Sequence, residues 1–157
     1  MPDITLVPVD PADREAMTAW VHAVTVAFQA PRPTDDEVTL RQERFAGQRL
    51  WAARDGDAVV GTFRSFDTHL DVPGGRVAAN ALSSVTVLPT HRRRGLLTRW
   101  MHEELSRARD AAAPVSILIA SEAPIYGRFG FGVAATSCPW TLDTRDARFR
   151  RPAGGTV

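Results

Sequence analysis

Lysine is absent from this sequence, although nineteen of its residues are basic. Every one of those nineteen is an arginine. Without a lysine amine, a chain cannot form a Schiff base, use lysine as a general base or contact phosphate through the lysine of a P-loop. These three kinds of chemistry are therefore excluded for the 157 residues.

Cysteine is almost absent as well, because Cys138 is the only one. A single cysteine excludes an internal disulfide and a cysteine-rich zinc site. We expect Cys138 to be a buried small hydrophobic residue, with a functional thiol as the alternative. His69, His91 and His102 have no partner carboxylate or cysteine at metal-ligand spacing, which predicts surface or capping roles and no metal site.

The sequence also lacks a long apolar run. No stretch approaches the ~20 apolar residues of a membrane-spanning helix, and the first residues lack the basic and apolar regions of a secretory signal. We therefore expect one globular domain in the cytoplasm, with no membrane partner. The net charge of +1 gives no overall nucleic-acid signature, and no nucleic-acid partner is predicted.

Hydrophobic periodicity predicts an alternation of strands and helices. The expected strands are 4–7, 50–54, 58–66, 76–87, 115–120 and 137–142. Helices are expected to open at Pro11, at a capping box on Thr34 and near Arg94, and a short helix should run through Tyr126. Asp-Gly at positions 55–56 predicts a tight hairpin turn. This order indicates a mixed α/β domain.

Residues 85–98 carry the most informative pattern: a strand, a turn with three consecutive arginines, and the start of the clearest helix. The first N–H groups of a helix lack internal partners and lie at the positive end of its dipole, so they can bind an anion. Gly95 allows close approach of a phosphate, and the arginines add charge-assisted hydrogen bonds. The pattern predicts a bound pyrophosphate. The alternatives are a solvated basic turn and a nucleic-acid patch, although no aromatic residues interleave the arginines.

Two motifs in the sequence resemble a known family. Arg92-Arg93-Arg94-Gly95-Leu96-Leu97 resembles the Gln/Arg-x-x-Gly-x-Gly/Ala pyrophosphate loop of the GNAT acetyltransferases, with leucine in the last position instead of glycine or alanine. The stretch Val85-Thr-Val-x-Pro-Thr-His-Arg-Arg-Arg-Gly-Leu-Leu is followed by Ala120-Ser-Glu-x-x-Ile-Tyr-Gly-Arg-Phe-Gly-Phe-Gly. Together these are similar, in residues and spacing, to the enhanced-intracellular-survival family of N-acetyltransferases. The likeness extends from the first strand to Trp140.

The resemblance implies a GNAT fold for residues 1–143: a mixed, mostly antiparallel sheet with splayed central parallel strands, flanked by helices. Residues 144–157 would be a polar tail or the start of a linker to a second domain. The implied cosubstrate is acetyl-CoA, with no metal. One strand would bind the pantetheine arm through its backbone, the following loop would bind the pyrophosphate, and the end of the next strand would close the site. The corresponding residues are Val85, Thr86 and Val87, then Arg93, Arg94, Gly95, Leu96, Leu97 and Thr98, and finally Ser121 and Glu122.

By the same resemblance, Tyr126 corresponds to the family's proton donor, which returns a proton to the coenzyme A thiolate. An unperturbed phenol, with a pKa of about 10, is protonated at neutral pH and can supply that proton. From the sequence alone, a core or interface aromatic is the alternative. The family's general base is the terminal carboxylate of a longer chain. This chain is therefore either a cut fragment or uses another base, such as Glu122, His22 or a water chain.

The activity implied by the resemblance is transfer of the acetyl group of acetyl-CoA to a primary amine. The acceptor would be a cationic small molecule, such as an aminoglycoside or a polyamine, or a lysine side chain. Asp35, Asp36 and Glu37 lie where the superfamily often places its acceptor lid, and they either attract a cationic amine or only begin a helix. The alternative function is a catalytically impaired CoA-binding domain with a regulatory or assembly role. A homo-oligomer is a further expectation.

Overall fold

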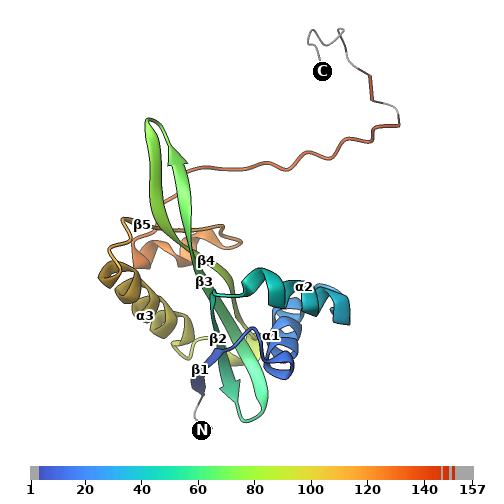
Figure 1. Cartoon of the computed structure of the whole chain (residues 1–157), viewed down its shortest axis with the longest axis vertical. Helices are drawn as coiled ribbons and strands as arrows, with labels where there is room; N and C mark the ends of the chain where they lie inside the picture. The colour runs from blue at the N-terminus through green and yellow to red at the C-terminus, as the bar shows by residue number, and fades with distance from the viewer. Residues whose placement is uncertain (1–3, 146, 149, 151–157) are drawn as a thin grey trace. The chain divides into compact units, whose positions relative to one another are not determined.

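The computed structural model describes residues 4–145, 147, 148 and 150 (Figure 1). The chain divides into two compact units, Met1–Glu122 and Ala123–Val157. No helix of the described residues is long and apolar enough to cross a membrane. The elements of the first unit are β1 (Thr5–Val9), α1 (Arg14–Ala27), α2 (Asp35–Phe45), β2 (Arg49–Asp55), β3 (Ala58–Val72), β4 (Gly75–Val87), η1 (Pro89–His91), α3 (Leu96–Asp110) and β5 (Val115–Leu118). The second unit contains η2 (Ala123–Ile125) and η3 (Gly127–Phe129), where η marks a 3₁₀ turn.

The five strands form one sheet in chain order, β1-β2-β3-β4-β5. The first four strands are antiparallel to their neighbours, whereas β5 is parallel to β4. A parallel pair requires a crossover connection, and α3 provides it. The predicted fold class is confirmed: the sheet is mixed, mostly antiparallel and flanked by helices (Figure 1). The parallel pair lies at one edge of the described sheet and not at its centre as predicted, because β5 has no further strand beside it.

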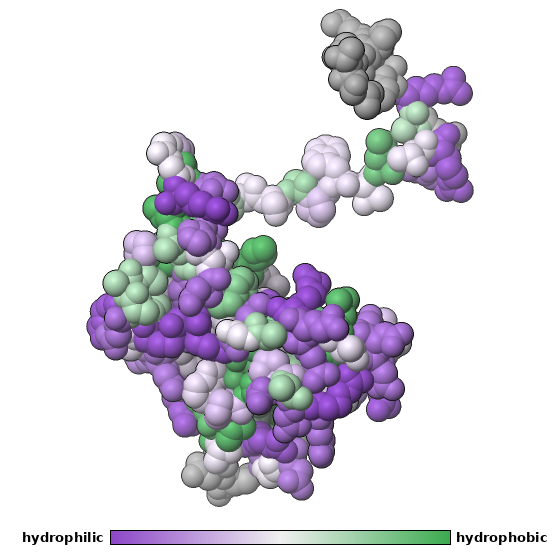
Figure 2. Space-filling view, viewed as in Figure 1, coloured by the Kyte–Doolittle hydropathy of each residue, from purple (hydrophilic) through white to green (hydrophobic). Residues whose placement is uncertain are grey.

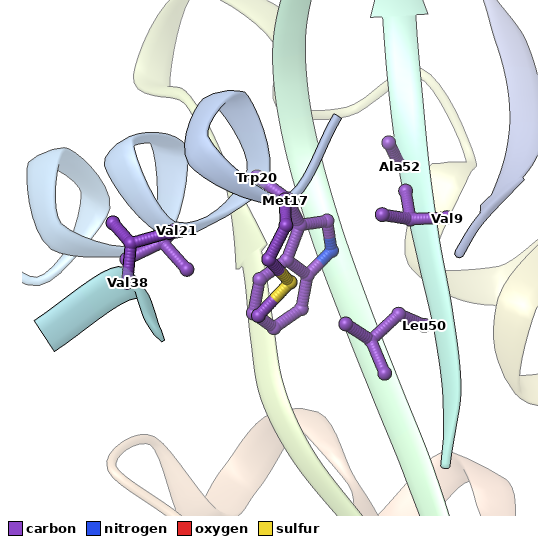
Figure 3. Close-up of a cluster of buried hydrophobic side chains, with 7 residues drawn as sticks. All are labelled: Val9, Met17, Trp20, Val21, Val38, Leu50 and Ala52. Atoms are coloured by element: carbon purple, nitrogen blue, oxygen red, sulfur yellow. The ribbon is translucent and has the colours of Figure 1, made fainter. Parts of the chain in front are cut away.

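Helices α1 and α2 cover one face of the sheet through a shared apolar cluster. Asp13 caps α1 by accepting hydrogen bonds from the N–H groups of Glu15 and Ala16, and the Trp20 indole N–H donates to the Trp51 carbonyl at 2.9 Å. The outward surface of these helices that Figure 2 shows is mostly hydrophilic. Burial of the apolar cluster supplies ~25 cal/mol per Å² of apolar surface removed from water. Its members, drawn in Figure 3, are Val9, Met17, Trp20, Val21, Val38, Leu50 and Ala52.

Helix α3 packs on the opposite face. Successive side chains of a strand alternate between faces, so Phe63 and its cross-strand partner Trp51 point away from α1. Phe63 stacks on Trp100 of α3, with ring centroids 5.7 Å apart. Gly61 lies beside this stack, where an added Cβ would be 2.9 Å from the Thr86 carbonyl oxygen and 3.0 Å from the Trp100 ring. Glycine at this position therefore permits the close approach of β3, β4 and α3.

A polar network fastens the C-terminal half of α3 to the sheet. The Glu104 side chain is only 5% exposed and lies 2.7 Å from Arg107 and 3.6 Å from Arg49. Asn80 Oδ1 accepts a hydrogen bond from each arginine at 3.0 Å. A hydrogen bond from Arg49 to Asp67 lowers the pKa of the Asp67 carboxyl, and Coulombic attraction by Arg49 and Arg107 acts in the same direction. The two guanidinium groups offset the cost of burying the Glu104 carboxylate.

Strands β3 and β4 continue beyond the other strands as a two-stranded ribbon, drawn in green in Figure 1. Their pairing runs to Val72 opposite Gly75, whereas β2 pairs with β3 only as far as Ser65. The sequence predicts an end to this strand at residue 66, but β4 supplies a ladder partner for the polar continuation, and the strand therefore extends to Val72. Gly74, with φ +90°, lies in the turn that joins the two strands.

The predicted strand over residues 137–142 is wrong. Residues 131–143 have no regular secondary structure, and Trp140 and Leu142 are 91% and 72% exposed. A strand must satisfy its backbone in a ladder with a neighbour, and none of the described strands pairs with this segment. Cys138 is consequently exposed instead of buried as predicted. Part of the predicted tail 144–157 lies outside the described residues.

Three further boundaries differ from the predictions. The fifth predicted strand ends at Leu118, two residues before the expected 120, because β4 and β5 stop pairing there. The short helix expected through Tyr126 is replaced by the two 3₁₀ turns η2 and η3. Helix α3 begins at Leu96 because Gly95 has a left-handed conformation that ends the preceding turn.

Candidate cofactor-binding site

Strand β4 carries a bulge opposite Phe63. The register between β3 and β4 shifts between Thr62 and Arg64, and Ser84 on β4 has a φ of +50°, which is uncommon for a residue other than glycine. The Thr62 hydroxyl donates to the Ser84 carbonyl at 2.8 Å and lies 2.7 Å from the Thr86 hydroxyl. Thr62 therefore ties both sides of the bulge to β3.

Strands β4 and β5 separate just before this bulge. Their parallel pairing ends at Leu82 opposite Leu118, and the next residue after β5, Ile119, is 99% exposed. Strand β4 nevertheless continues to Val87, still paired with β3. Within the described chain, the other edge of residues 83–87 has no strand against it, so backbone groups on that edge are open to an extended ligand. This separation is the predicted splay, and it includes Val85, Thr86 and Val87.

The turn between β4 and α3 has the backbone conformation of an anion site. Arg93 and Gly95 have φ values of +63° and +76°, and Gly95 is the N-cap of α3, which no side chain caps. The first amide bonded back along the helix is that of Arg99, which donates to the Gly95 carbonyl at 3.0 Å. The N–H groups of residues 96–98 therefore lack an intrahelical acceptor and carry the positive end of the helix dipole.

The three arginines of this turn are exposed and have different neighbours. The Nε of Arg92 donates to the Val87 carbonyl at 3.5 Å, and Nη2 of Arg94 donates to the Thr90 carbonyl at 3.3 Å. Both hydrogen bonds are long and therefore weak. Arg93 has no hydrogen bond or ion pair with any described residue, which leaves its guanidinium group available to an anion.

The first of the predicted residues in α3 offers a ligand its backbone and not its side chain. Leu96 is 3% exposed and belongs to the core, so only its N–H group can meet a ligand. Leu97 is half-buried and Thr98 is exposed. Leucine at position 97 is therefore compatible with the site, because the group offered to an anion there is the amide.

The residues predicted to close the site lie at the end of the first unit. Ser121 and Glu122 follow β5 and are both exposed. The next element, η2, is a single 3₁₀ turn, so these residues do not begin a longer helix. Their contact with a cofactor stays a prediction.

Tyr126 lies in the second unit, between η2 and η3. Its ring packs edge-on against Phe131, with centroids 6.1 Å apart and planes at 68°. Its carbonyl accepts a hydrogen bond from the Phe129 N–H at 2.9 Å, and Gly130 closes the turn with φ +89°. These contacts hold Tyr126 within a short aromatic turn. Its role as a proton donor stays a prediction.

Comparison with known proteins decides the family. The model of the acetyltransferase (GNAT) domain family matches residues 8–134, which contain the whole sheet from the end of β1, the arginine turn and Tyr126. This chain belongs to the GNAT acetyltransferase family.

The relatives of this GNAT domain are longer proteins. An uncharacterized N-acetyltransferase of Streptomyces avermitilis is 44% identical over 148 residues, covering 90% of this chain and 35% of the relative. The N-acetyltransferase Eis of Mycobacterium tuberculosis is 43% identical over 142 residues, covering 90% of this chain and 31% of the relative. The suspected likeness to the enhanced-intracellular-survival family is thus confirmed. The chain spans about a third of the length of these relatives.

Solved structures agree with the fold. Eis1 from Mycobacterium abscessus matches with a TM-score of 0.69 at 30% identity, covering 84% of this chain and 32% of that one. A predicted acetyltransferase from Clostridium acetobutylicum, solved with acetyl-CoA, matches with a TM-score of 0.65 at 17% identity, covering 89% and 97% of the two chains. At 17% identity the likeness shows the fold alone.

Two of the three acidic residues at the start of α2, Asp35 and Glu37, have structural partners in this GNAT domain. Glu37 and Thr34 form a reciprocal capping box, with distances of 2.9 and 3.3 Å, and Asp35 lies 3.4 Å from Arg14. The expectation that they begin a helix is confirmed. Among the described residues, no group of three or more histidine, cysteine or acidic side chains is placed to hold a metal.

Sequence reasoning missed three residues that shape the site. Ser84 and Thr62 form the bulge, and neither has a sequence signal, because the bulge depends on the register of two paired strands. Gly61 had a signal: an isolated glycine inside a strand marks a bulge or a close backbone approach. His91, predicted to be a surface or capping residue, is half-buried and lies 3.1 Å from Asp55.

Proposed function

We propose that this GNAT domain is an N-acetyltransferase that uses acetyl-CoA to acetylate a primary amine. The acceptor is the amine of a cationic small molecule, such as an aminoglycoside or a polyamine, or of a lysine side chain. The observation that carries this proposal is the continuity of the site: the open edge of β4 at residues 83–87 leads, through the turn of residues 88–95, into the uncapped start of α3. An open strand edge followed by an uncapped helix start matches a ligand that consists of an extended arm ending in a pyrophosphate.

The residues present fit acetyl-CoA. Residues 85–98 contain no acidic side chain and three arginines, so this segment has no negative charge to repel a pyrophosphate. The N–H groups of residues 96–98 and the Arg93 guanidinium supply donors at the turn. The backbone of Val85, Thr86 and Val87 supplies donors and acceptors to an amide-containing arm, as one strand does to another.

The bound cosubstrate would supply an activated acetyl thioester. In this proposal, backbone N–H groups on the open edge of β4 polarise the thioester carbonyl and stabilise the charge that develops on its oxygen. The Tyr126 phenol holds the proton that the departing sulfur requires. The amine must be neutral when it attacks, and we assign its proton to none of the described residues.

An amine acceptor is supported by the names of the relatives, and a cationic one by an exposed acidic residue. The relatives carry the name N-acetyltransferase. Asp36 at the start of α2 has no ion pair with the described residues and is exposed, so it is free to attract a cationic amine. The longer relatives include chain that these residues do not represent.

Cofactor binding is tested first, by calorimetric titration of the chain with acetyl-CoA. Arg93→Ala should weaken binding by about 10- to 150-fold, since a charge-assisted hydrogen bond contributes about 1.5–3 kcal/mol. Arg76→Ala is the matched control, because Arg76 is an exposed arginine on the ribbon with a 65% exposed side chain. Failure of the unchanged chain to bind acetyl-CoA would overturn the proposal.

Catalysis is tested separately, by following the acetylated amine with mass spectrometry. This readout is preferable to thiol detection because the exposed Cys138 would react with a thiol reagent. Tyr126→Phe should slow acetyl transfer by about 10²–10⁴-fold while acetyl-CoA binding is retained, if the phenol is the general acid. Binding without turnover of any amine would support the CoA-binding domain with a regulatory or assembly role instead.

A further inference from the structure

Asp55 and His91 join two turns that are far apart in the sequence. Nε2 of His91 lies 3.1 Å from Oδ2 of Asp55, and its Nδ1 lies 2.8 Å from the Thr90 hydroxyl. The side chains of His91 and Asp55 are only 16% and 25% exposed. Both imidazole nitrogens therefore have partners, and the ring is fixed in orientation.

The Asp55 carboxylate is anchored to the sheet. Asp55 is the last residue of β2 and pairs with Ala58 across the hairpin turn. Gly56 has a φ of +57°, which the tight turn requires. Ala52 and Ala53, just before the turn, are fully buried in the sheet. The hairpin therefore fixes the position of the Asp55 carboxylate, and through it the position of the His91 ring.

His91 is the last fixed point before the anion-binding turn. The backbone N–H of His91 donates to the Leu88 carbonyl at 2.8 Å, and the backbone N–H of Leu88 donates to the Val60 carbonyl at 2.9 Å. These two hydrogen bonds tie η1 to β3. From residue 92 to the N-cap of α3, the chain has no regular secondary structure and contains two residues with positive φ. The two arginine side-chain contacts described above and a hydrogen bond from the Arg92 backbone N–H to the Pro89 carbonyl, at 3.3–3.5 Å, are all long, so this stretch is weakly restrained.

We infer that the Asp55–His91 pair is a positioning pair for the pyrophosphate-binding turn. Neither side chain is assigned a contact with the cofactor. The pair holds the entry to the turn at a fixed place on the sheet, while the buried Leu96 holds its exit. Without the pair, the backbone of residues 92–95 has more conformations to lose when an anion binds, and affinity falls. This inference rests on the proposed function.

The competing explanation is that the pair only stabilises the fold. Arg54 provides a matched comparison, because its guanidinium donates to the Asp57 carbonyl at 3.0 Å in the same hairpin and has no link to the turn before α3. Loss of either interaction should lower stability. Only loss of the Asp55–His91 contact should change the binding of a pyrophosphate-containing ligand.

The test is calorimetric titration with acetyl-CoA of the unchanged chain and of Asp55→Ala, His91→Ala, the double variant and Arg54→Ala. Each single change in the pair should raise Kd about tenfold, and the double variant should be no weaker than either single one, as expected for two residues that act as a unit. Asp55→Asn, which keeps an acceptor oxygen, should recover part of the affinity. Arg54→Ala should bind as the unchanged chain does.

A kinetic readout separates positioning from a general loss of structure. With an amine that is turned over, the pair variants should raise the KM for acetyl-CoA and leave kcat at saturating cofactor unchanged. Kd values within twofold of the unchanged chain, or an equal loss in Arg54→Ala, would overturn the inference and leave the proposed function standing. Absence of binding to the unchanged chain would overturn both.

Discussion

The hydroxyl groups of Thr62 and Thr86 lie 2.7 Å apart between β3 and β4. The Thr62 hydroxyl also donates to the Ser84 carbonyl at 2.8 Å. Because a hydroxyl has one hydrogen to donate, the Thr86 hydroxyl must be the donor to Thr62. This short chain of hydrogen bonds holds Ser84 in its left-handed conformation at the place where β4 leaves β5.

Thr62→Val should destabilise the domain and weaken acetyl-CoA binding. Valine has nearly the same shape but cannot make either hydrogen bond, so the free energy of unfolding should fall by about 1–2 kcal/mol. Urea denaturation and calorimetric titration measure the two effects. Thr68→Val, at a half-buried threonine of the ribbon, is the control. An equal loss of cofactor affinity in Thr68→Val would show that the bulge has no special role.

Gly61→Ala should destabilise the domain through a steric clash. The added Cβ would lie 2.9 Å from the Thr86 carbonyl oxygen, and overpacking of this kind costs about 1–3 kcal/mol. Gly75→Ala, where nothing lies within 4 Å of the added Cβ, should cost less. Thermal denaturation of the two variants makes the comparison, and equal melting temperatures would contradict the close packing at Gly61.

Gly95→Ala should combine backbone strain with a loss of cofactor affinity. Gly95 and Gly47 have similar φ values, +76° and +74°, and neither has an atom within 4 Å of an added Cβ. Each alanine should therefore cost about 1 kcal/mol of conformational strain. Only Gly95→Ala should also weaken acetyl-CoA binding, because it disturbs the uncapped N–H groups of α3. Unchanged affinity in Gly95→Ala would argue against an anion site at this helix start.

Glu104→Gln should lower the free energy of unfolding by about 2–3 kcal/mol, because it removes the buried carboxylate and leaves two partly buried arginines with only the exposed Asp67 as an acidic partner. Glu103→Gln changes the neighbouring exposed carboxylate on the same helix and should have little effect. Denaturant unfolding at low and at high salt measures the difference. A loss in Glu104→Gln no greater than that in Glu103→Gln would mean that the network does not fasten α3.

The absence of lysine predicts that the chain does not acetylate its own side-chain amines. Arginine stays protonated at all ordinary pH values and is a poor nucleophile. Intact-mass measurement after incubation with acetyl-CoA should show at most one added acetyl group, at the α-amino group, once hydroxylamine has removed any thioester on Cys138. Arg76→Lys should make a further acetyl group possible. Additional stable acetyl groups on the unchanged chain would contradict the prediction.

The elements with strong local signals could be predicted from the sequence. The capping box at Thr34, the tight turn after Asp55 and the apolar face of α3 all depend on nearby residues, and all three are present. The prediction over residues 137–142 was wrong because a strand also needs a partner, which alternation along the chain does not reveal. The length of β3 was underestimated for the related reason that its polar extension is stabilised by pairing with β4.

The sequence by itself determined the chemistry of the candidate site: three arginines and a glycine before a helix, with no lysine and no acidic residue between Val85 and Thr98. Local backbone preference and charge are properties of neighbouring residues, so they can be read along the chain. Only the tertiary structure decided that β4 leaves β5 after Leu82, that Thr62 braces Ser84 and that Asp55 holds His91. Each of these contacts joins residues that are distant in sequence, and their geometry is set by strand register and packing instead of by local preference.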